Sequence, residues 1–239
     1  DTIIISSSAD LTADHLNEAT RFLVRTNYRL AAFDLDGTLL QESSSWVKLH
    51  KHFGTLSKAD QNLAAYQRRE IDYAEFMRRD VALWPRRLRI SVIERLLLSY
   101  VLVPDAVEVV RELRRLGCQI AIVTCGLDTL AGKVGRRLNV DHVLANDLVT
   151  DGRGFLTGEV VFRVDLFDKG QALADLADKL RIPLSASVAV GDSKFDRSFL
   201  EAAGLGVAYR PEPELIPYAD VVIDRLGQLP SLLRDPEGI

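Results

Sequence analysis

The stretch YRLAAFDLDGTL, residues 28–39, decides the fold. Its first half, Tyr28–Phe33, is a short and mostly apolar run, and a polar turn with two acids follows it directly. Such a pattern is typical of a strand that is buried on both faces of a parallel sheet. Ligands of these sheets bind at the carboxyl ends of the strands. We therefore expect the first core strand to end at Asp34 and Asp36, and a functional site to begin there.

Beyond Pro104 the chain alternates between helical and strand patterns. Apolar periodicity and turn residues predict helices at 105–116, 128–138, 168–180 and 194–203, strands at 119–124, 142–145, 187–190, 206–208 and 220–223, and a hairpin over 148–162. Strands separated by helices imply a mostly parallel sheet with helices on both faces. The predicted fold class is α/β.

The segment between these two parts has a different character. Residues 43–103 lack strand-like runs, and amphipathic helical patterns occur at 46–53, 60–69, 73–84 and 92–98. We interpret this segment as a small helical domain inserted after the first core strand. The core domain would then comprise 29–42 and 104–239, and residues 1–28 would form an N-terminal extension with a helix over 11–26.

Composition excludes several classes of protein. The 239 residues are 47% apolar and 27% charged, as in ordinary globular chains, and the net charge of −4 lacks the basic excess of a nucleic-acid-binding protein. An arginine-rich stretch at 68–89 is either a solvated helical face or a patch that steers an anionic substrate. The apolar run at Ile3–Ile5 is shorter than a membrane span, so we expect no membrane partner. The two cysteines fit a reducing, cytoplasmic compartment.

Polar clusters follow the predicted strands and open one helix. They are Asp34, Asp36, Gly37 and Thr38; Thr124, Cys125 and Gly126; Gly191, Asp192 and Ser193 with Asp196; and Lys169 at the start of a helix. Three of the four clusters lie at strand carboxyl ends, where the architecture places its site. Asp34 and Asp36 should point to the same side, so that like charge would raise the pKa of one of them.

This pattern suits phosphoryl transfer. A phosphate dianion among carboxylates requires cations, which Mg²⁺ and Lys169 can supply, and Asp34 and Asp192 offer the oxygen ligands that Mg²⁺ prefers. Thr124 and the following backbone amides can hold phosphoryl oxygens as their charge develops. Gly126 allows the backbone to come close to the substrate.

The run Phe33–Leu39 resembles the first motif of haloacid dehalogenase (HAD) phosphatases, and Thr124, Lys169 and Asp192 with Asp196 are similar to motifs two, three and four. The resemblance implies a Rossmann-like core with a helical cap, and an aspartyl-phosphate formed on Asp34. It implies that Asp36 is the general acid and base and that Thr124 and Lys169 hold phosphate. We place Asp34, Asp36 and Asp192 around Mg²⁺, with Asp196 as a supporting acid behind them, and Thr38, Cys125 and Gly126 near the substrate.

Within this superfamily the chain looks most like the phosphoserine phosphatase branch, with two departures in the cap. Ser43 stands where that branch has a glutamate for the substrate amine, with Glu42 adjacent, and Asp80 stands where it has an arginine for the substrate carboxylate, with Arg79 adjacent. Either Asp80 faces the ligand or it pairs with a nearby arginine. Cys125 also replaces a usual glycine.

We therefore predict a Mg²⁺-dependent phosphomonoesterase that acts on a small phosphorylated metabolite, with L-phosphoserine a poor substrate and a smaller or cationic-headed ester preferred. A phosphotransferase with the same intermediate is an alternative, because cap closure controls access of water. A catalytically silent ligand-binding protein of the same fold is another. Intact Asp36 and Lys169 argue against the silent protein.

Overall fold

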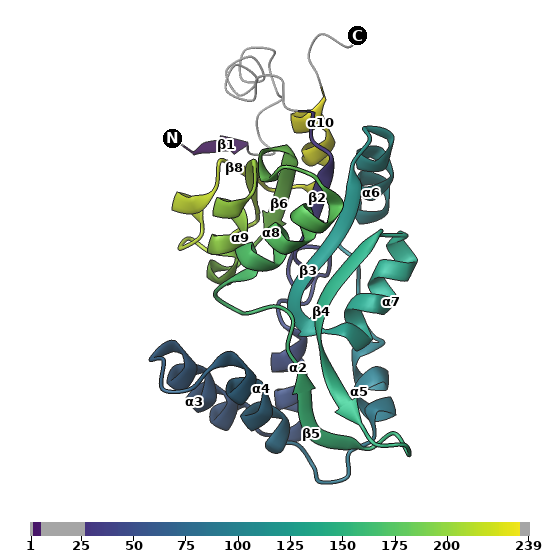
Figure 1. Ribbon diagram of the computed structural model, residues 1–239, viewed down its shortest axis with the longest axis vertical. Coiled ribbons are helices and arrows are strands. Elements are labelled where there is room, and N and C mark those ends of the chain that lie inside the picture. The colour runs from purple at the N-terminus through teal and green to yellow at the C-terminus, as the bar shows by residue number, and fades with distance from the viewer. Residues whose placement is uncertain (1, 6–26, 235–239) are drawn as a thin grey trace.

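The computed structural model describes residues 2–5 and 27–234, and Figure 1 shows their arrangement. One eight-stranded sheet runs through the molecule in the order β1-β8-β7-β6-β2-β3-β4-β5. The strands are β1 (Ile3–Ile5), β2 (Leu30–Phe33), β3 (Gln119–Leu127), β4 (His142–Thr150), β5 (Leu156–Val161), β6 (Ser187–Gly191), β7 (Leu205–Tyr209) and β8 (Val221–Ile223). Among these eight strands of the described residues, β4 and β5 pair antiparallel and the other neighbours pair parallel. The predicted α/β class is confirmed.

Helices cover both faces of the sheet. The helices among the described residues are α2 (Ser45–Phe53), α3 (Leu56–Gln67), α4 (Tyr73–Ala82), α5 (Ile90–Leu97), α6 (Ala106–Arg115), α7 (Asp128–Leu138), α8 (Lys169–Leu180), α9 (Arg197–Ala202) and α10 (Leu229–Leu233). Helices α6 and α7 lie against one face, and α8 and α9 against the other (Figure 1). Helices α2–α5 follow β2 and lie toward one end of the molecule (Figure 1).

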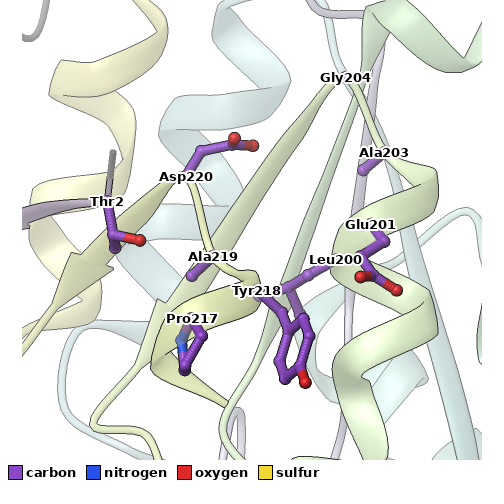
Figure 2. A pocket seen from close by; sticks show the side chains of 9 residues that line it. All are labelled: Thr2, Leu200, Glu201, Ala203, Gly204, Pro217, Tyr218, Ala219 and Asp220. Carbon is purple, nitrogen blue, oxygen red and sulfur yellow. The ribbon is translucent and has the colours of Figure 1, made fainter.

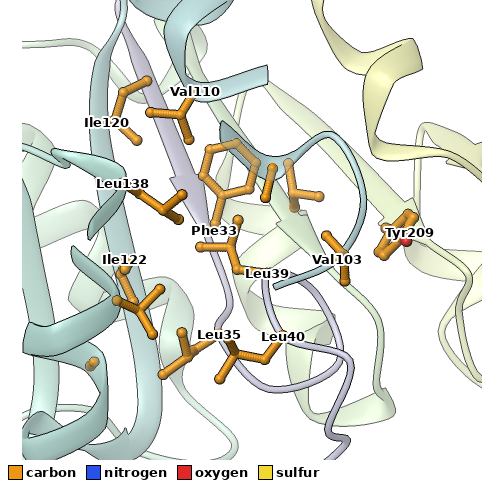
Figure 3. Packing of buried hydrophobic residues seen from close by; sticks show 14 of the residues in the cluster. Phe33, Leu35, Leu39, Leu40, Val103, Val110, Ile120, Ile122, Leu138 and Tyr209 are labelled. Carbon is orange, nitrogen blue, oxygen red and sulfur yellow. The ribbon is translucent and has the colours of Figure 1, made fainter. Parts of the chain in front are cut away.

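Alternation along the central strand produces two hydrophobic clusters. Ala31 and Phe33 of β2 belong to the cluster under α6 and α7, whereas Leu30 and Ala32 belong to the cluster under α8 and α9. This is the period-two alternation of side chains in a strand. Figure 3 shows Phe33 at the centre of the first cluster, among side chains of β3, α6 and the loop after β2. All four strand residues are fully buried, so β2 is fixed firmly where it ends at Asp34.

The inserted helices have clear start and stop signals. Ser44 caps α2 by accepting a hydrogen bond from the Val47 amide, and Gly54 ends this helix with a φ of 66°. Asp72 caps α4 by accepting from the Glu75 amide at 2.7 Å. Pro85 follows α4, which explains why this helix ends at Ala82 although the apolar pattern continues to Trp84.

Some expectations differ from the structure. Strand β1 was not predicted, because three apolar residues become a strand only through parallel pairing with β8. The predicted helix at 194–203 divides into a 3₁₀ turn and α9. The predicted helix at 11–26 lies outside the described residues, and the division into core and cap domains stays a prediction. No helix within residues 2–5 and 27–234 is long and apolar enough to cross a membrane.

Candidate active site

The loop after β2 is shaped by its contact with Asp192. The Asp34 amide continues the sheet by donating to the Val190 carbonyl at 2.9 Å. Gly37 then adopts a φ of +84°, and a Cβ atom at this position would lie only 2.2 Å from Oδ2 of Asp192. The Thr38 hydroxyl donates to Oδ1 of Asp192 at 2.8 Å. Glycine is therefore required here both for its backbone conformation and for its lack of a side chain.

Lys169, the first residue of α8, joins two of the predicted acids. Its Nζ donates to Oδ1 of Asp34 at 2.6 Å and to Oδ1 of Asp196 at 2.5 Å. All three side chains are buried. Oδ2 of Asp196 accepts hydrogen bonds from the amides of Asp192 and Ser193 at 3.1 and 3.0 Å. Asp196 thus orients the lysine and also holds the loop that carries Asp192.

Three carboxylates crowd around this lysine. Oxygen atoms of Asp34, Asp192 and Asp196 lie within 4.8 Å of one another. Burial, opposed by Lys169 and reinforced by the neighbouring acids Asp196 and Asp192, raises the pKa of Asp34. Burial and then Asp196 raise the pKa of Asp192 to about 7. Burial acts to lower the pKa of Lys169, but Asp196 and Asp34 outweigh it and the lysine stays charged.

The charge of this cluster fits a divalent cation. One ammonium group faces three carboxylates, and this excess of negative charge adds to burial in raising the pKa values of Asp34 and Asp192. Oxygen ligands from one or two carboxylates are what Mg²⁺ usually takes from a protein. Asp34 and Asp192 are the residues that would hold it, since Asp196 is already bound by Lys169 and by two backbone amides.

Asp36 lies outside this carboxylate group. Its Oδ2 accepts from both the amide and the hydroxyl of Ser45, each at 2.7 Å, and its Oδ1 is buried with no partner among the described residues. Burial raises the pKa of Asp36, against the lowering effect of Ser45. The acids that contribute most to the raised pKa of Asp34 are Asp196 and Asp192, so the strong coupling between Asp34 and Asp36 that their spacing suggested is not what the structure shows.

After Val123, the fifth residue of β3, the pairing with β4 becomes irregular. The register between β3 and β4 shifts between Val123 and Leu127, so Thr124, Cys125 and Gly126 lie in an irregular part of the strand. The Gly126 amide donates to the Thr124 hydroxyl at 3.0 Å. Irregularities of this kind are frequent beside active sites, because they redirect backbone groups away from the neighbouring strand.

A cavity of about 340 Å³ brings most of the predicted site residues together. The predicted residues that line it are Asp34, Asp36, Ser43, Asp80, Thr124, Cys125, Gly126 and Lys169. Thr38, predicted to contact substrate, is not among the lining residues and instead holds Asp192. Burial raises the pKa of Cys125 to about 12, so its thiol is neutral at physiological pH.

Asp80 is arranged differently from both expectations, because its carboxylate contacts side chains of α2 and α3. Oδ2 of Asp80 lies 3.2 Å from Nε2 of His50, and Oδ1 accepts from Nδ2 of Asn62 at 2.8 Å. The expected arginine partners are engaged elsewhere, since Arg78 and Arg79 both pair with Glu75. None of the described residues that line the cavity is an arginine. Asp80 therefore borders the cavity while bonded within the cap.

Sequence reasoning missed the residues that support the predicted ones. Ser45 binds Asp36, and the indole Nε1 of Trp46 donates to the Cys125 carbonyl at 3.1 Å. His50 and Asn62 bind Asp80. Ser45 could have been found, because a run of three serines follows the first motif. The others lie on helices whose register only tertiary packing fixes.

A second hollow, of about 400 Å³, lies beside β7, β8 and α9 (Figure 2). It shares no lining residue with the first cavity. Its acids are already engaged, since Asp220 accepts from the Gly206 amide at 2.8 Å and Glu201 pairs with Arg197. This hollow offers no group of reactive side chains, so the first cavity is the candidate active site.

Comparison with known proteins agrees with this geometry. Residues 31–201 match the family model of haloacid dehalogenase-like hydrolases. The chain belongs to this family. It is 34% identical over 218 residues to a phosphoserine phosphatase of Streptomyces coelicolor, covering 86% of this chain and 52% of that protein. It is also 34% identical to a phosphoserine phosphatase of Idiomarina loihiensis, covering 82% of this chain and 88% of that protein. The predicted resemblance to the phosphoserine phosphatase branch is confirmed.

Solved structures point to the same branch. A structure described as a phospho-aspartyl intermediate analogue of phosphoserine phosphatase superposes with a TM-score of 0.70 at 28% identity, covering 83% of this chain and 94% of that one. A substrate-bound phosphoserine phosphatase complex has the same TM-score at 27% identity, covering 83% of this chain and 93% of that one. The chain spans 50–60% of the length of the first three curated relatives it matches.

Proposed function

We propose that this chain is a Mg²⁺-dependent phosphomonoester hydrolase that forms an aspartyl-phosphate on Asp34. The observation that carries the proposal is the carboxylate of Asp34, held 2.6 Å from Lys169 beside Asp192, in a cavity that Asp36 also lines. A carboxylate fixed by an ammonium group at the end of a central strand is placed to act as a nucleophile. The family membership of the chain supports this assignment.

The proposed reaction has two steps, in which Asp34 and Asp36 have different roles. A carboxylate oxygen of Asp34 attacks phosphorus, and the ester oxygen leaves with a proton from Asp36. Water then attacks the same phosphorus, Asp36 takes the proton of the water, and phosphate departs as the Asp34 carboxylate is regenerated. The raised pKa of Asp36 favours the protonated form that the first step needs. Bound Mg²⁺ would neutralise part of the charge on the phosphoryl oxygens.

The phosphoryl group would be held by residues around Asp34. Lys169 and Thr124 both line the cavity, and the irregular part of β3 that contains Cys125 and Gly126 lines it next to them. Such groups can bind the equatorial oxygens as their charge develops. Asp196 orients Lys169, and Thr38 orients Asp192.

We further propose that L-phosphoserine is a poor substrate. Ser43 lines the cavity, whereas Glu42 accepts from the Val101 amide and is not a lining residue, so the acid next to Ser43 does not substitute for the missing glutamate. Asp80, which stands where the phosphoserine phosphatase branch has a carboxylate-binding arginine, borders the cavity. The two buried free thiols are in keeping with a cytoplasmic location.

A phosphate-release screen tests the proposal. The wild-type protein is assayed with p-nitrophenyl phosphate and a panel of phosphorylated metabolites, with Mg²⁺ and with excess chelator. We expect turnover that requires the metal. When an alcohol is added, we expect the phosphoryl group to go to water and to appear as inorganic phosphate. Transfer to the alcohol would instead support a phosphotransferase. Full activity in chelator, or no turnover of any ester, would contradict the proposed hydrolase.

A further inference from the structure

The part of the cavity beyond the carboxylates is built largely from apolar side chains. Helices α2, α3 and α4 contribute one wall, and the segments before α8 and α9 contribute the other. The apolar residues that line the cavity are Trp46, Val47, Leu56, Ala59, Leu63, Tyr73, Phe76, Leu166 and Phe195. A ligand whose phosphate reaches Lys169 would place its leaving group among these side chains.

The same cavity has no free cation for a second anionic group. Lys169 is its one lysine among the described residues, and it is already bound to Asp34 and Asp196. Nε2 of His50 faces Asp80. Further acids, Asp60 and Glu212, also line the cavity. A carboxylate on the leaving group would therefore be desolvated without a partner, which is strongly unfavourable.

Asp80 is not available as a dedicated partner for an amine. Each of its two oxygens already has a partner within the cap, from His50 on one side and Asn62 on the other. His50 in turn lies 2.8 Å from the Thr55 hydroxyl through Nδ1 and stacks on Trp46. This buried network fixes the relation of α2, α3 and α4, so its role is to shape the apolar wall.

We infer that the substrate of this site is a phosphate ester whose leaving group is apolar in its body and free of carboxylate. The inference rests on the proposed function for the position of the phosphate, and it goes beyond it by naming the chemistry of the leaving group. Burial of apolar surface against Phe76 and Leu63 supplies the recognition. Absence of a carboxylate avoids the unpaired charge.

Two matched pairs of esters test the inference. O-phosphoethanolamine differs from L-phosphoserine by the carboxylate alone, and 2-phenylethyl phosphate differs from ethyl phosphate by the phenyl group alone. In each pair we expect the first member to have a kcat/KM at least about tenfold higher, since even one apolar group in a fitting pocket changes discrimination by that order. L-phosphoserine preferred over O-phosphoethanolamine, or no gain from the phenyl group, would overturn the inference.

A binding measurement separates the inference from the proposed function. Calorimetry with 2-phenylethylphosphonate and ethylphosphonate in the presence of Mg²⁺ needs no turnover, and we expect the phenyl compound to bind at least about tenfold more tightly. If the phenyl compound binds more tightly by this factor but no ester is hydrolysed, the proposed phosphatase activity is contradicted and the apolar subsite is still supported. Equal affinities, or no binding of either phosphonate at millimolar concentration, would overturn the inference.

Two phenylalanines provide a matched pair of variants. Phe76 and Phe162 both contact the ring of Tyr73, at centroid distances of 5.6 and 5.5 Å, but only Phe76 lines the cavity. Phe76→Ala should reduce the ratio of affinities for the two phosphonates several-fold, whereas Phe162→Ala should leave this ratio unchanged. Thermal melting of both variants checks that the cap remains folded. The same ratio in both variants would show that the apolar wall does not contact the leaving group.

Discussion

Lys169 supplies the positive charge that pairs with two buried carboxylates of the site. Its ammonium group is buried between Asp34 and Asp196, and both contacts are short. A buried charge is tolerated only when its partners satisfy it, and the loss of one partner leaves the other unpaired. Asp34, the proposed nucleophile, and Asp196 are therefore both bound to one cation, which fixes the position of the Asp34 carboxylate.

The two acids of the first motif should respond differently to the same substitution. We expect Asp34→Asn to abolish turnover, because an amide cannot form the aspartyl-phosphate. Asp36→Asn should slow turnover by about 10²–10⁴-fold and leave binding of inorganic phosphate intact, because only the proton transfer is lost. Phosphate release and phosphate binding are measured for both variants. Wild-type-like turnover by Asp34→Asn, shown by mass spectrometry to be free of deamidation, would refute the nucleophile assignment.

The cysteines should be chemically silent in the folded protein. Burial raises the pKa of Cys118 to about 11 and that of Cys125 to about 12, so neither forms the reactive thiolate near neutral pH. We expect a disulfide reagent to titrate no thiol rapidly in the native state at pH 8, and both thiols after unfolding in guanidinium. Cys125→Ala should retain activity. Loss of activity with the fold intact would give Cys125 a direct role.

At the scale of single elements, the turn after β2 is tightly constrained. Gly37 and Gly154 both have positive φ, but a Cβ atom at Gly37 would meet Asp192 whereas a Cβ atom at Gly154 would meet nothing within 4 Å. Both alanine variants incur the backbone cost of about 1–2 kcal/mol. Only Gly37→Ala must also displace Asp192.

We therefore expect Gly37→Ala to lose most of its Mg²⁺ affinity and activity, and Gly154→Ala to lose stability alone. Chemical denaturation gives the free energy of unfolding, and titration with Mg²⁺ gives the affinity of each variant. If Gly37→Ala bound Mg²⁺ as tightly as Gly154→Ala does, Asp192 would not be a metal ligand positioned by this turn.

The elements that could be predicted from the sequence are those with strong local signals. The helix at 128–138 was predicted with both of its bounds, because Asp128 begins it and Asn139, with a φ of 56°, ends it. Strand β1 could not be predicted, since it depends on pairing with β8 near the other end of the sequence, and the register shift in β3 depends on how β4 is placed beside it. The N-terminal turn of α3 was missed because Leu56 follows a glycine-containing turn.

For the molecule as a whole, stability should depend on pH and metal together. The pKa of Asp192 is about 7 in the folded protein and lies above its ordinary value of 3.8. Between these values the folded state binds the proton more tightly than the unfolded chain does, so this group adds stability at low pH that is lost as the pH rises toward 7 and beyond. Metal requires the ionised carboxylate, so its stabilising effect has the opposite trend.

We expect the increase in Tm on adding Mg²⁺ to be larger at pH 8 than at pH 5.5. In Asp192→Asn this pH dependence should become weaker, because one of the two carboxylates at which protons compete with the metal is gone. Scanning calorimetry at both pH values, with metal and with chelator, checks the prediction. An equal Mg²⁺ effect at the two pH values in the wild-type protein would show that Asp192 does not take part in metal binding.

For the molecule as a whole, the sequence predicted which residues come together at the site, but it did not predict their hydrogen-bond partners. Strand ends brought Asp34, Thr124 and Asp192 to one edge of the sheet, as parallel strands require. The partners of Asp80 could not be predicted, because the register of α2 against α4 is set by packing around Trp84 and not by local sequence. Thr38 was assigned to the substrate, and its contact with Asp192 appears only when β6 is placed beside β2.

The position of β2 between β3 and β6 has a consequence for biosynthesis. Its partner on one side, beginning at Ser187, leaves the ribosome long after Leu30 does, at about 5–20 residues per second. Throughout that interval β2 presents an unpaired apolar edge, which is the kind of surface that chaperones recognise. Lys169 and Asp192 also arrive late. A nascent chain therefore carries Asp34, the proposed nucleophile, before Lys169 and Asp192 are made, and we expect a product that terminates before Lys169 to be inactive.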